Sequence, residues 1–266
     1  MLSSSSNNGT NKETCIEAIN LRTRKLNGFK LLTVFSREYG LIKLSGSKLG
    51  GRSEPFVHNL YWIGNSKSEI HSIKHSEFKG QFRNITTDLD KLSLAWQYAE
   101  FLEACSHHQE ERSSEIFDLF QETLSQLAQA ANNDFAPISN NFFWHLSELL
   151  GYKASLALCD QPETNCALKS RPESVEAWFD FEHGGILCSA CKQRPSGDCI
   201  RVLPGIYKLL NILENSNQKT NTNNSVKNIA AEDFVTNILQ KHLQKHTDRK
   251  MKSTNISKHL KSGSKA

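Results

Sequence analysis

Long apolar runs are missing from this sequence of 266 residues. No stretch of about 18 apolar residues occurs, so no transmembrane helix and no membrane partner are predicted. Residues 1–8 are polar and uncharged and lack the basic and apolar regions of a secretory signal peptide. Seven cysteines in a chain without such a signal argue against a disulfide framework and for a reducing cytoplasm.

Motifs of common enzyme classes are missing as well. Gly50-Gly51 is not followed by the Lys-Ser/Thr pair of a phosphate-binding loop, and no Gly-x-Ser-x-Gly nucleophile elbow occurs. Asp88 and Asp90 stand at an expected helix start, where capping explains them better than catalysis. His107-His108 is better explained as part of a solvated turn than as a metal site. The sequence therefore predicts a protein that is not an enzyme.

The net charge of +4 conceals an uneven distribution of charged residues. Residues 1–80 contain 12 Lys+Arg against 6 Asp+Glu, residues 81–180 contain 6 against 16, and residues 181–266 contain 14 against 6. A basic head and a basic tail around an acidic middle indicate a polyanionic partner. A chance partition of surface charge is the alternative.

The first third of the chain predicts a small β-barrel. Five short apolar or alternating runs between residues 14 and 82 are separated by turns that contain glycine. So many short strands in so few residues fit a closed barrel, although periodicity alone does not separate a barrel from a small sandwich. Residues 1–13 are rich in Ser and Asn and are predicted to be disordered.

After residue 86 the apolar residues recur at helical spacing. The expected helices cover residues 89–102, 116–131, 142–150, 204–213 and 230–246, with a polar connector at 132–141. They form a predicted helical domain at residues 83–250. Within it, residues 215–226 are polar and of low complexity, which indicates a flexible loop. A basic tail at residues 251–266 follows.

Basic residues of the barrel region are candidates for contacts with nucleic acid. They cluster near the expected strand ends and turns: Arg22, Arg24, Lys25, Lys30, Arg37, Lys43, Lys48 and Arg52. Small barrels bind single strands through a charged groove and stacked aromatic rings, and such binding weakens steeply with salt. We expect at most two of six aromatic residues to be exposed here: Phe29, Phe35, Tyr39, Phe56, Tyr61 and Trp62.

Cysteines in the second half could close a tetrahedral zinc site. The candidate ligands are Cys159, Cys166, Cys188 and Cys191, with Cys199 and His183 as spare ligands. Only one pair has the Cys-x-x-Cys spacing, and the upstream pair is too widely spaced for a usual second knuckle. A site that folds without metal is the alternative. A redox role is disfavoured because no thioredoxin-like βαβ pattern surrounds the motif.

Several segments together resemble the RecO family of bacterial DNA repair proteins. They are AINLRTR (18–24), LTVFSREYGL (32–41), LGGRSEPF (49–56), LSELLGY (146–152), FDFEHGGILC (179–188) and RKMKS (249–253). Their order and spacing along the chain carry the resemblance. Two positions depart from the family pattern, because the glycine loop at 46–51 is short with a single Lys48, and Pro162 replaces a cysteine.

The resemblance implies an α+β chain with an OB-fold barrel at residues 14–82, followed by an all-helical domain with a zinc-finger-like insertion at about residues 159–199. It implies binding of single- and double-stranded DNA and annealing of complementary strands in the cytoplasm, at the nucleoid. It also implies work with RecR and single-strand-binding protein to load RecA in the RecF pathway, with no required cofactor. An RNA-binding protein and a zinc-dependent hydrolase are the alternatives.

Overall fold

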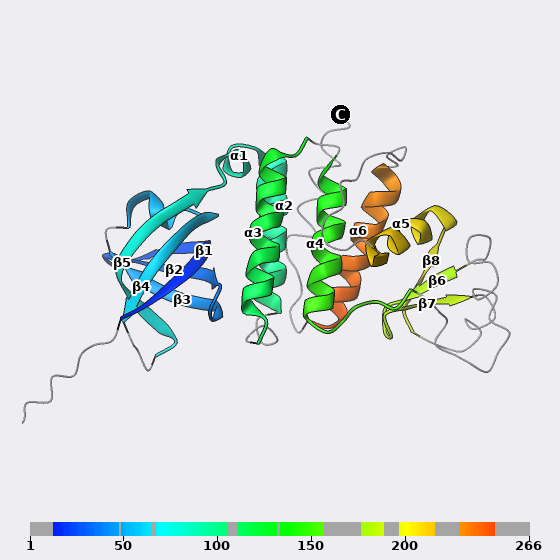
Figure 1. Cartoon of the computed structure of the whole chain (residues 1–266), viewed down its shortest axis with the longest axis horizontal. Helices are drawn as coiled ribbons and strands as arrows, with labels where there is room; N and C mark the ends of the chain where they lie inside the picture. Colours follow the sequence, from blue (N-terminus) through cyan, green and yellow to red (C-terminus); the bar gives the residue numbers. More distant parts are fainter. Residues whose placement is uncertain are drawn as a thin grey trace, which may run out of the picture.

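The computed structural model describes residues 13–47, 49–64, 68–105, 111–131, 134–156, 177–188, 197–215 and 229–247. A strand-rich unit lies at one end of these residues, helices lie in the middle and a small sheet lies at the other end (Figure 1). The predicted mixed α+β class is confirmed. Within the described ranges, no helix has the length and apolar character needed to cross a membrane.

Five strands form a closed barrel in the order β1-β2-β3-β5-β4. They are β1 (Glu13–Leu26), β2 (Phe29–Ser36), β3 (Gly40–Gly46), β4 (Val57–Gly64) and β5 (Ile70–Gln81). The β3–β5 pair that closes the barrel is parallel, and the other pairs are antiparallel. Side chains alternate across each strand, so Leu32, Val34 and Leu44 fill the interior.

A polar network inside the barrel fixes the short 3-10 helix η1 (Gly50–Ser53) that leads from β3 to β4. The amide nitrogens of Asn20 and Asn59 donate to the carbonyl of Arg52 at 2.6 and 3.0 Å. The hydroxyl of Tyr61 donates to Asn20 Oδ1 at 2.7 Å, and Asn59 donates to that hydroxyl at 2.8 Å. Burial raises the pKa of Tyr61 to about 12, so the phenol stays a donor.

Within the described ranges, six helices follow the barrel: α1 (Arg83–Thr86), α2 (Leu89–Ala104), α3 (Ser113–Gln129), α4 (Phe135–Leu149), α5 (Pro204–Asn215) and α6 (Ile229–Lys245). Asp88 caps α2, accepting hydrogen bonds from two backbone N–H groups as its position predicts. The predicted connector at 132–141 was wrong from Phe135 onward. Pro137 lies in the first turn of α4, where its missing N–H leaves no helical hydrogen bond unmade.

The larger hydrophobic core joins the barrel to the helices. Ile19, Leu21, Phe35 and Phe56 of the barrel region are fully buried in the same cluster as the apolar faces of α2, α3, α4 and α6. The barrel interior forms a second, smaller cluster. The barrel wall that faces the helices is therefore interior on both sides, and only the remaining wall is available to a ligand.

The predicted insertion at about residues 159–199 overlaps a three-stranded antiparallel sheet, which the sequence pattern did not predict. Its strands are β6 (Ala177–Asp180), β7 (Gly185–Cys188) and β8 (Cys199–Val202), in the order β7-β6-β8. Each strand has four residues, too few for a period to be read from the sequence. Phe179 and Phe181 are fully buried beside the helices.

Helix α6 anchors this sheet. His242 Nε2 donates to the carbonyl of Tyr152 at 2.7 Å, and its ring lies edge-on to Phe179. Lys241 Nζ pairs with Asp198 Oδ1 at 2.6 Å. Gly184, with a φ of 66°, lies so close to α6 that an added Cβ would sit 2.6 Å from His242 Cε1.

Several sequence-based predictions fall outside the described residues. They concern residues 1–12, most of the insertion at 159–199, the loop at 216–226 and the tail at 251–266. Glu13 is the first residue of β1, and Asn215 is the last residue of α5.

Candidate nucleic-acid interface

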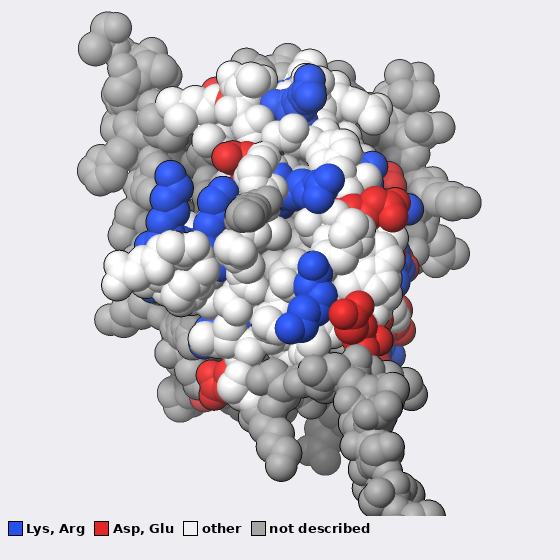
Figure 2. Space-filling model, turned by 90° about the vertical axis from the view of Figure 1, so that its left-hand side faces the viewer, with Lys and Arg blue, Asp and Glu red and all other residues white. Residues whose placement is uncertain are grey.

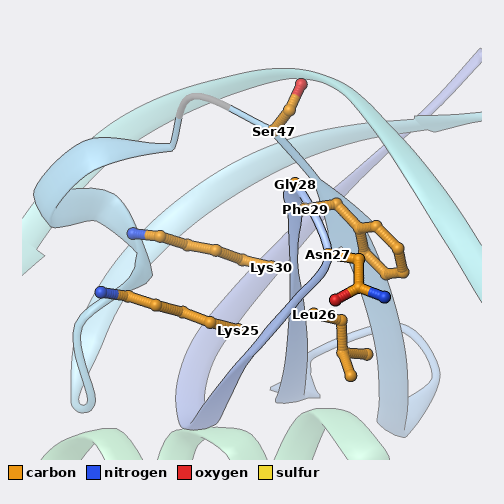
Figure 3. Close-up of a pocket in the computed structure, with 7 residues that line it drawn as sticks. All are labelled: Lys25, Leu26, Asn27, Gly28, Phe29, Lys30 and Ser47. Atoms are coloured by element: carbon orange, nitrogen blue, oxygen red, sulfur yellow. The ribbon is translucent and has the colours of Figure 1, made fainter.

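The β1–β2 hairpin projects a mixed basic and apolar tip. Asn27-Gly28 connects the strands, and Gly28 has a φ of 93°, which glycine adopts without strain. Lys25 pairs with Lys30 across the ladder, and Leu26 pairs with Phe29. Because side chains alternate, the two lysines point to one side of the hairpin, whereas Leu26, Asn27 and Phe29 lie on the other (Figure 3).

An open hollow of about 300 Å³ surrounds this tip. It is lined by Lys25, Leu26, Asn27, Gly28, Phe29, Lys30 and Ser47 (Figure 3). Leu26 and Phe29 are each 43% exposed, which is unusual for a pair of large apolar side chains side by side. The hollow combines a ring face, an aliphatic side chain, two ammonium groups and two neutral polar groups.

Two of the predicted DNA-binding residues, Arg24 and Lys25, are exposed and available for a ligand. Neither makes a hydrogen bond or ion pair with the other residues that the structure describes. Lys43 on β3 is also exposed, and its contact with Glu69 Oε2 at 3.7 Å joins two solvated side chains and stabilises little. These three cations are therefore the strongest candidates for phosphate contacts.

Arg22 and Arg37 face the helices instead of the ligand side. Arg22 Nε donates to Glu103 Oε1 of α2 at 2.8 Å. Arg37 Nε donates to Glu17 Oε2 at 2.6 Å, and its Nη1 lies 2.7 Å from Asp118 Oδ1 of α3. Both guanidinium groups already have a carboxylate partner, so they join the barrel to the helical body.

Glu17 shows how the Arg37 contact changes local acidity. Burial raises the pKa of this carboxyl, but the hydrogen bond and charge of Arg37, with His58, outweigh it and hold the pKa below its usual range. Burial lowers the pKa of His58 despite the Glu17 contact at 2.9 Å. The barrel side of this interface is therefore an ionised carboxylate between a cation and a neutral imidazole at neutral pH.

Lys30 and Arg52 hold η1 against the barrel. Lys30 Nζ donates to the carbonyl of Gly50 at 3.2 Å and to Ser53 Oγ. Arg52 Nη1 donates to the carbonyl of Ser76 on β5 at 2.8 Å. Lys48, the last of the eight predicted residues, lies outside the described residues. The seven candidates that the structure describes therefore do not form a single patch.

The outer face of β2 and β3 continues the hairpin surface. The register pairs Leu31 with Ser45 and Thr33 with Lys43, and these side chains point away from the barrel interior. In oligonucleotide-binding barrels this face and the β1–β2 loop hold the strand. On the barrel end of the molecule, Lys and Arg side chains spread across the middle and Asp and Glu lie mostly toward the edges (Figure 2).

The aromatic prediction is confirmed. Phe29 and Tyr39 are 43% and 51% exposed, Trp62 is half-buried, and Phe35, Phe56 and Tyr61 are fully buried. Sequence reasoning did not single out Leu26, Asn27 and Ser47, although the Asn-Gly turn between two apolar runs is a strong signal for a hairpin.

The zinc prediction falls largely outside the described residues. Cys188 is buried at the end of β7, while Cys159, Cys166 and Cys191 belong to segments that are not described. Of the spare ligands, Cys199 begins β8, and His183 Nδ1 lies 2.8 Å from Asp180 Oδ2. In the part of the chain that the structure describes, no three His, Cys, Asp or Glu side chains are grouped as metal ligands.

Comparison with known proteins assigns the chain to a family. The family model for the C-terminal part of recombination protein O matches residues 86–254. The DNA repair protein RecO of Dehalococcoides mccartyi is 27% identical over 201 residues, which cover 68% of this chain and 75% of the relative. That of Cyanothece sp. is 31% identical over 151 residues, 53% of this chain and 50% of the relative. That of Synechococcus sp. is 25% identical over 245 residues, 85% of this chain and 82% of the relative.

The family model covers well over half of the sequence, and the match to the Synechococcus relative, which covers 85% of the chain, reaches into the barrel, so this chain belongs to the RecO family.

Proposed function

We propose that this protein acts in DNA repair and recombination as a mediator that binds single- and double-stranded DNA and anneals complementary strands. Its N-terminal barrel is an OB-fold that binds the DNA strand. With RecR and single-strand-binding protein as partners, it helps to load RecA. It works on DNA as a binding protein and not as an enzyme.

The observation that carries this proposal is the hairpin tip with its unpaired cations. Arg24 and Lys25 have no partner among the described residues, and exposed Leu26 and Phe29 lie beside them. Cations neutralise phosphates without regard to sequence, and an exposed ring accepts any base. A surface of this kind binds strands of any sequence, as an annealing protein requires.

We also propose that no bound cofactor is needed, with zinc as an optional addition. The small sheet already has an anchor on α6 through Lys241–Asp198 and His242–Tyr152. Chelation of metal should therefore leave the unfolding temperature and DNA binding unchanged. A loss of both on chelation, with zinc measured in the purified protein, would contradict this part of the proposal.

The test is the salt dependence of binding to a labelled, mixed-sequence single strand, with annealing of its complement followed in the same sample without ATP. We expect binding to fall steeply between about 50 mM and about 200 mM salt. Arg24→Glu and Lys25→Glu should each make the negative slope of log K against log salt shallower by about one. Lys208→Glu, a matched reversal of an exposed lysine on α5, should leave the slope unchanged.

The alternatives predict different results in the same assay. A general RNA binder would prefer RNA to DNA of equal length, and a metal-dependent hydrolase would cut the labelled strand when metal is added. Consumption of ATP by the protein alone would also contradict the proposal. Absence of both binding and annealing at low salt would refute the annealing role outright.

A further inference from the structure

The two sides of the hairpin tip carry different side chains, one suited to phosphates and the other suited to bases. Lys25 and Lys30 extend on one side, and Leu26, Asn27 and Phe29 lie on the other (Figure 3). Arg24, two residues before Leu26 on the same strand, alternates to the side of the ring. The ammonium groups and the ring are therefore separated by the thickness of one two-stranded ribbon.

The ring of Phe29 is presented without a covering side chain. It is 43% exposed, its ladder partner Leu26 is equally exposed, and the structure describes no aromatic partner for it. Lys30, one residue along, is held by η1, which fixes this end of β2. An exposed ring on a fixed stretch of backbone loses less conformational entropy when a flat ligand stacks on it than a ring on a mobile loop would.

Polar groups flank the ring. Asn27 lies beside Phe29 on the same side of the hairpin, and Ser47, the residue after β3, lines another part of the same hollow (Figure 3). A side-chain amide and a hydroxyl can each both donate and accept a hydrogen bond. They therefore suit the edge of any base and do not select one base over another.

Resting on the proposed function, we infer that the hollow at the hairpin tip holds one unpaired base of single-stranded DNA, stacked on Phe29 with its edge at Asn27 and Ser47. The strand straddles the hairpin, so that its bases lie on the side of Phe29 and Leu26, while its phosphates contact Lys25 on the other side and Arg24 at the edge of the base side. A base in a duplex is already stacked and paired, so the hollow takes unpaired strands and not duplex DNA.

The test compares two probes, a mixed-sequence single strand of DNA and a strand of equal length made of abasic sites. Wild-type protein should bind the strand with bases more tightly. Phe29→Ala should weaken binding of that strand by about 5-fold to 150-fold, as expected for the loss of one stacked base. It should leave binding of the abasic strand, binding of duplex DNA and the salt slope unchanged.

Three further variants separate stacking from shape. Phe29→Trp should keep the preference for bases, whereas Phe29→Leu, which is apolar but has no ring, should lose it. Tyr39→Ala is the matched control, because Tyr39 is a similarly exposed ring in the turn beyond the opposite end of β2, next to Glu38. It should bind both probes as wild type does. Unchanged melting temperatures would show that the variants fold.

The outcomes distinguish the inference from the function on which it rests. If the wild type binds both probes with a steep salt dependence and Phe29→Ala keeps its preference for bases, the inference fails and the DNA-binding function stands. If the wild type binds neither probe, the proposed function fails and the inference falls with it.

Discussion

The role of Arg37 gives the sharpest prediction, because sequence and structure assign this residue to different tasks. Its position in a basic cluster suggests a phosphate contact, whereas the structure places its guanidinium between Glu17 of the barrel and Asp118 of α3, 4.5 Å from the centroid of the Phe117 ring. We therefore expect Arg37→Ala to reduce the stability of the protein and to have little effect on DNA affinity.

The size of the effect follows from the exposure of each partner. The side chains of Arg37 and Glu17 are 31% and 24% exposed, so their charged hydrogen bond contributes about 1 kcal/mol after discounting for solvent. Asp118 is 62% exposed and contributes about 0.3 kcal/mol. The contact with the Phe117 ring contributes about 0.5–1 kcal/mol. Together they predict a loss of about 2 kcal/mol in the free energy of unfolding.

Thermal unfolding and DNA titration on the same samples provide the assay. A loss of about 2 kcal/mol should lower Tm by roughly 4 °C in a protein of this size. Lys43→Ala, which removes only the solvated contact with Glu69, should change Tm by less than about 1 °C. An Arg37→Ala protein with wild-type Tm and a DNA affinity as low as that of Lys25→Glu would refute the assignment.

Three further predictions concern the interior. Tyr61→Phe should cost about 1–3 kcal/mol in urea unfolding, because Asn20 loses the donor to its buried oxygen; a change under about 0.5 kcal/mol would show that the network is not needed. Gly184→Ala should cost more than about 2 kcal/mol, since the added Cβ combines a positive φ with a clash on His242, and a wild-type Tm would contradict this. Burial, and then the charge of His242, lower the pKa of His246 in the folded protein. Below about pH 6.5 the unfolded chain therefore binds a proton at this histidine more readily than the folded chain does, so the free energy of unfolding falls as the pH falls. His246→Phe keeps the aromatic stack and should flatten the decline of Tm between about pH 7.5 and about pH 5.5; an unchanged decline would assign it to other groups.

The barrel strands and the main helices could be predicted because their signals are local. Glycine indicates a turn, as at Gly28, and apolar residues at helical spacing together with a cap such as Asp88 indicate a helix. The β6–β8 sheet could not be predicted in the same way. Its strands of four residues become a sheet only because Phe179 and Phe181 are buried against helices distant in the sequence.

The candidate site was predictable in composition but not in arrangement. The sequence shows that the barrel region is rich in Lys and Arg, yet it does not show that Glu103 meets Arg22 or that Asp118 meets Arg37. These contacts join segments far apart in the chain, and no local pattern encodes them. The tertiary fold decides which cations remain available for a ligand. Among the described candidates these are chiefly Arg24, Lys25 and Lys43.

The shared core has a consequence for how this protein can be divided. Ile19, Leu21, Phe35 and Phe56 belong to the barrel in sequence but to the helical cluster in packing. A fragment that ends after β5 would expose these side chains to water as an apolar, aggregation-prone patch, and the helices alone would expose the apolar faces that pack against them. The two halves should therefore melt in one transition, and a graft of this barrel onto another scaffold must bring the facing sides of α2 and α3 with it.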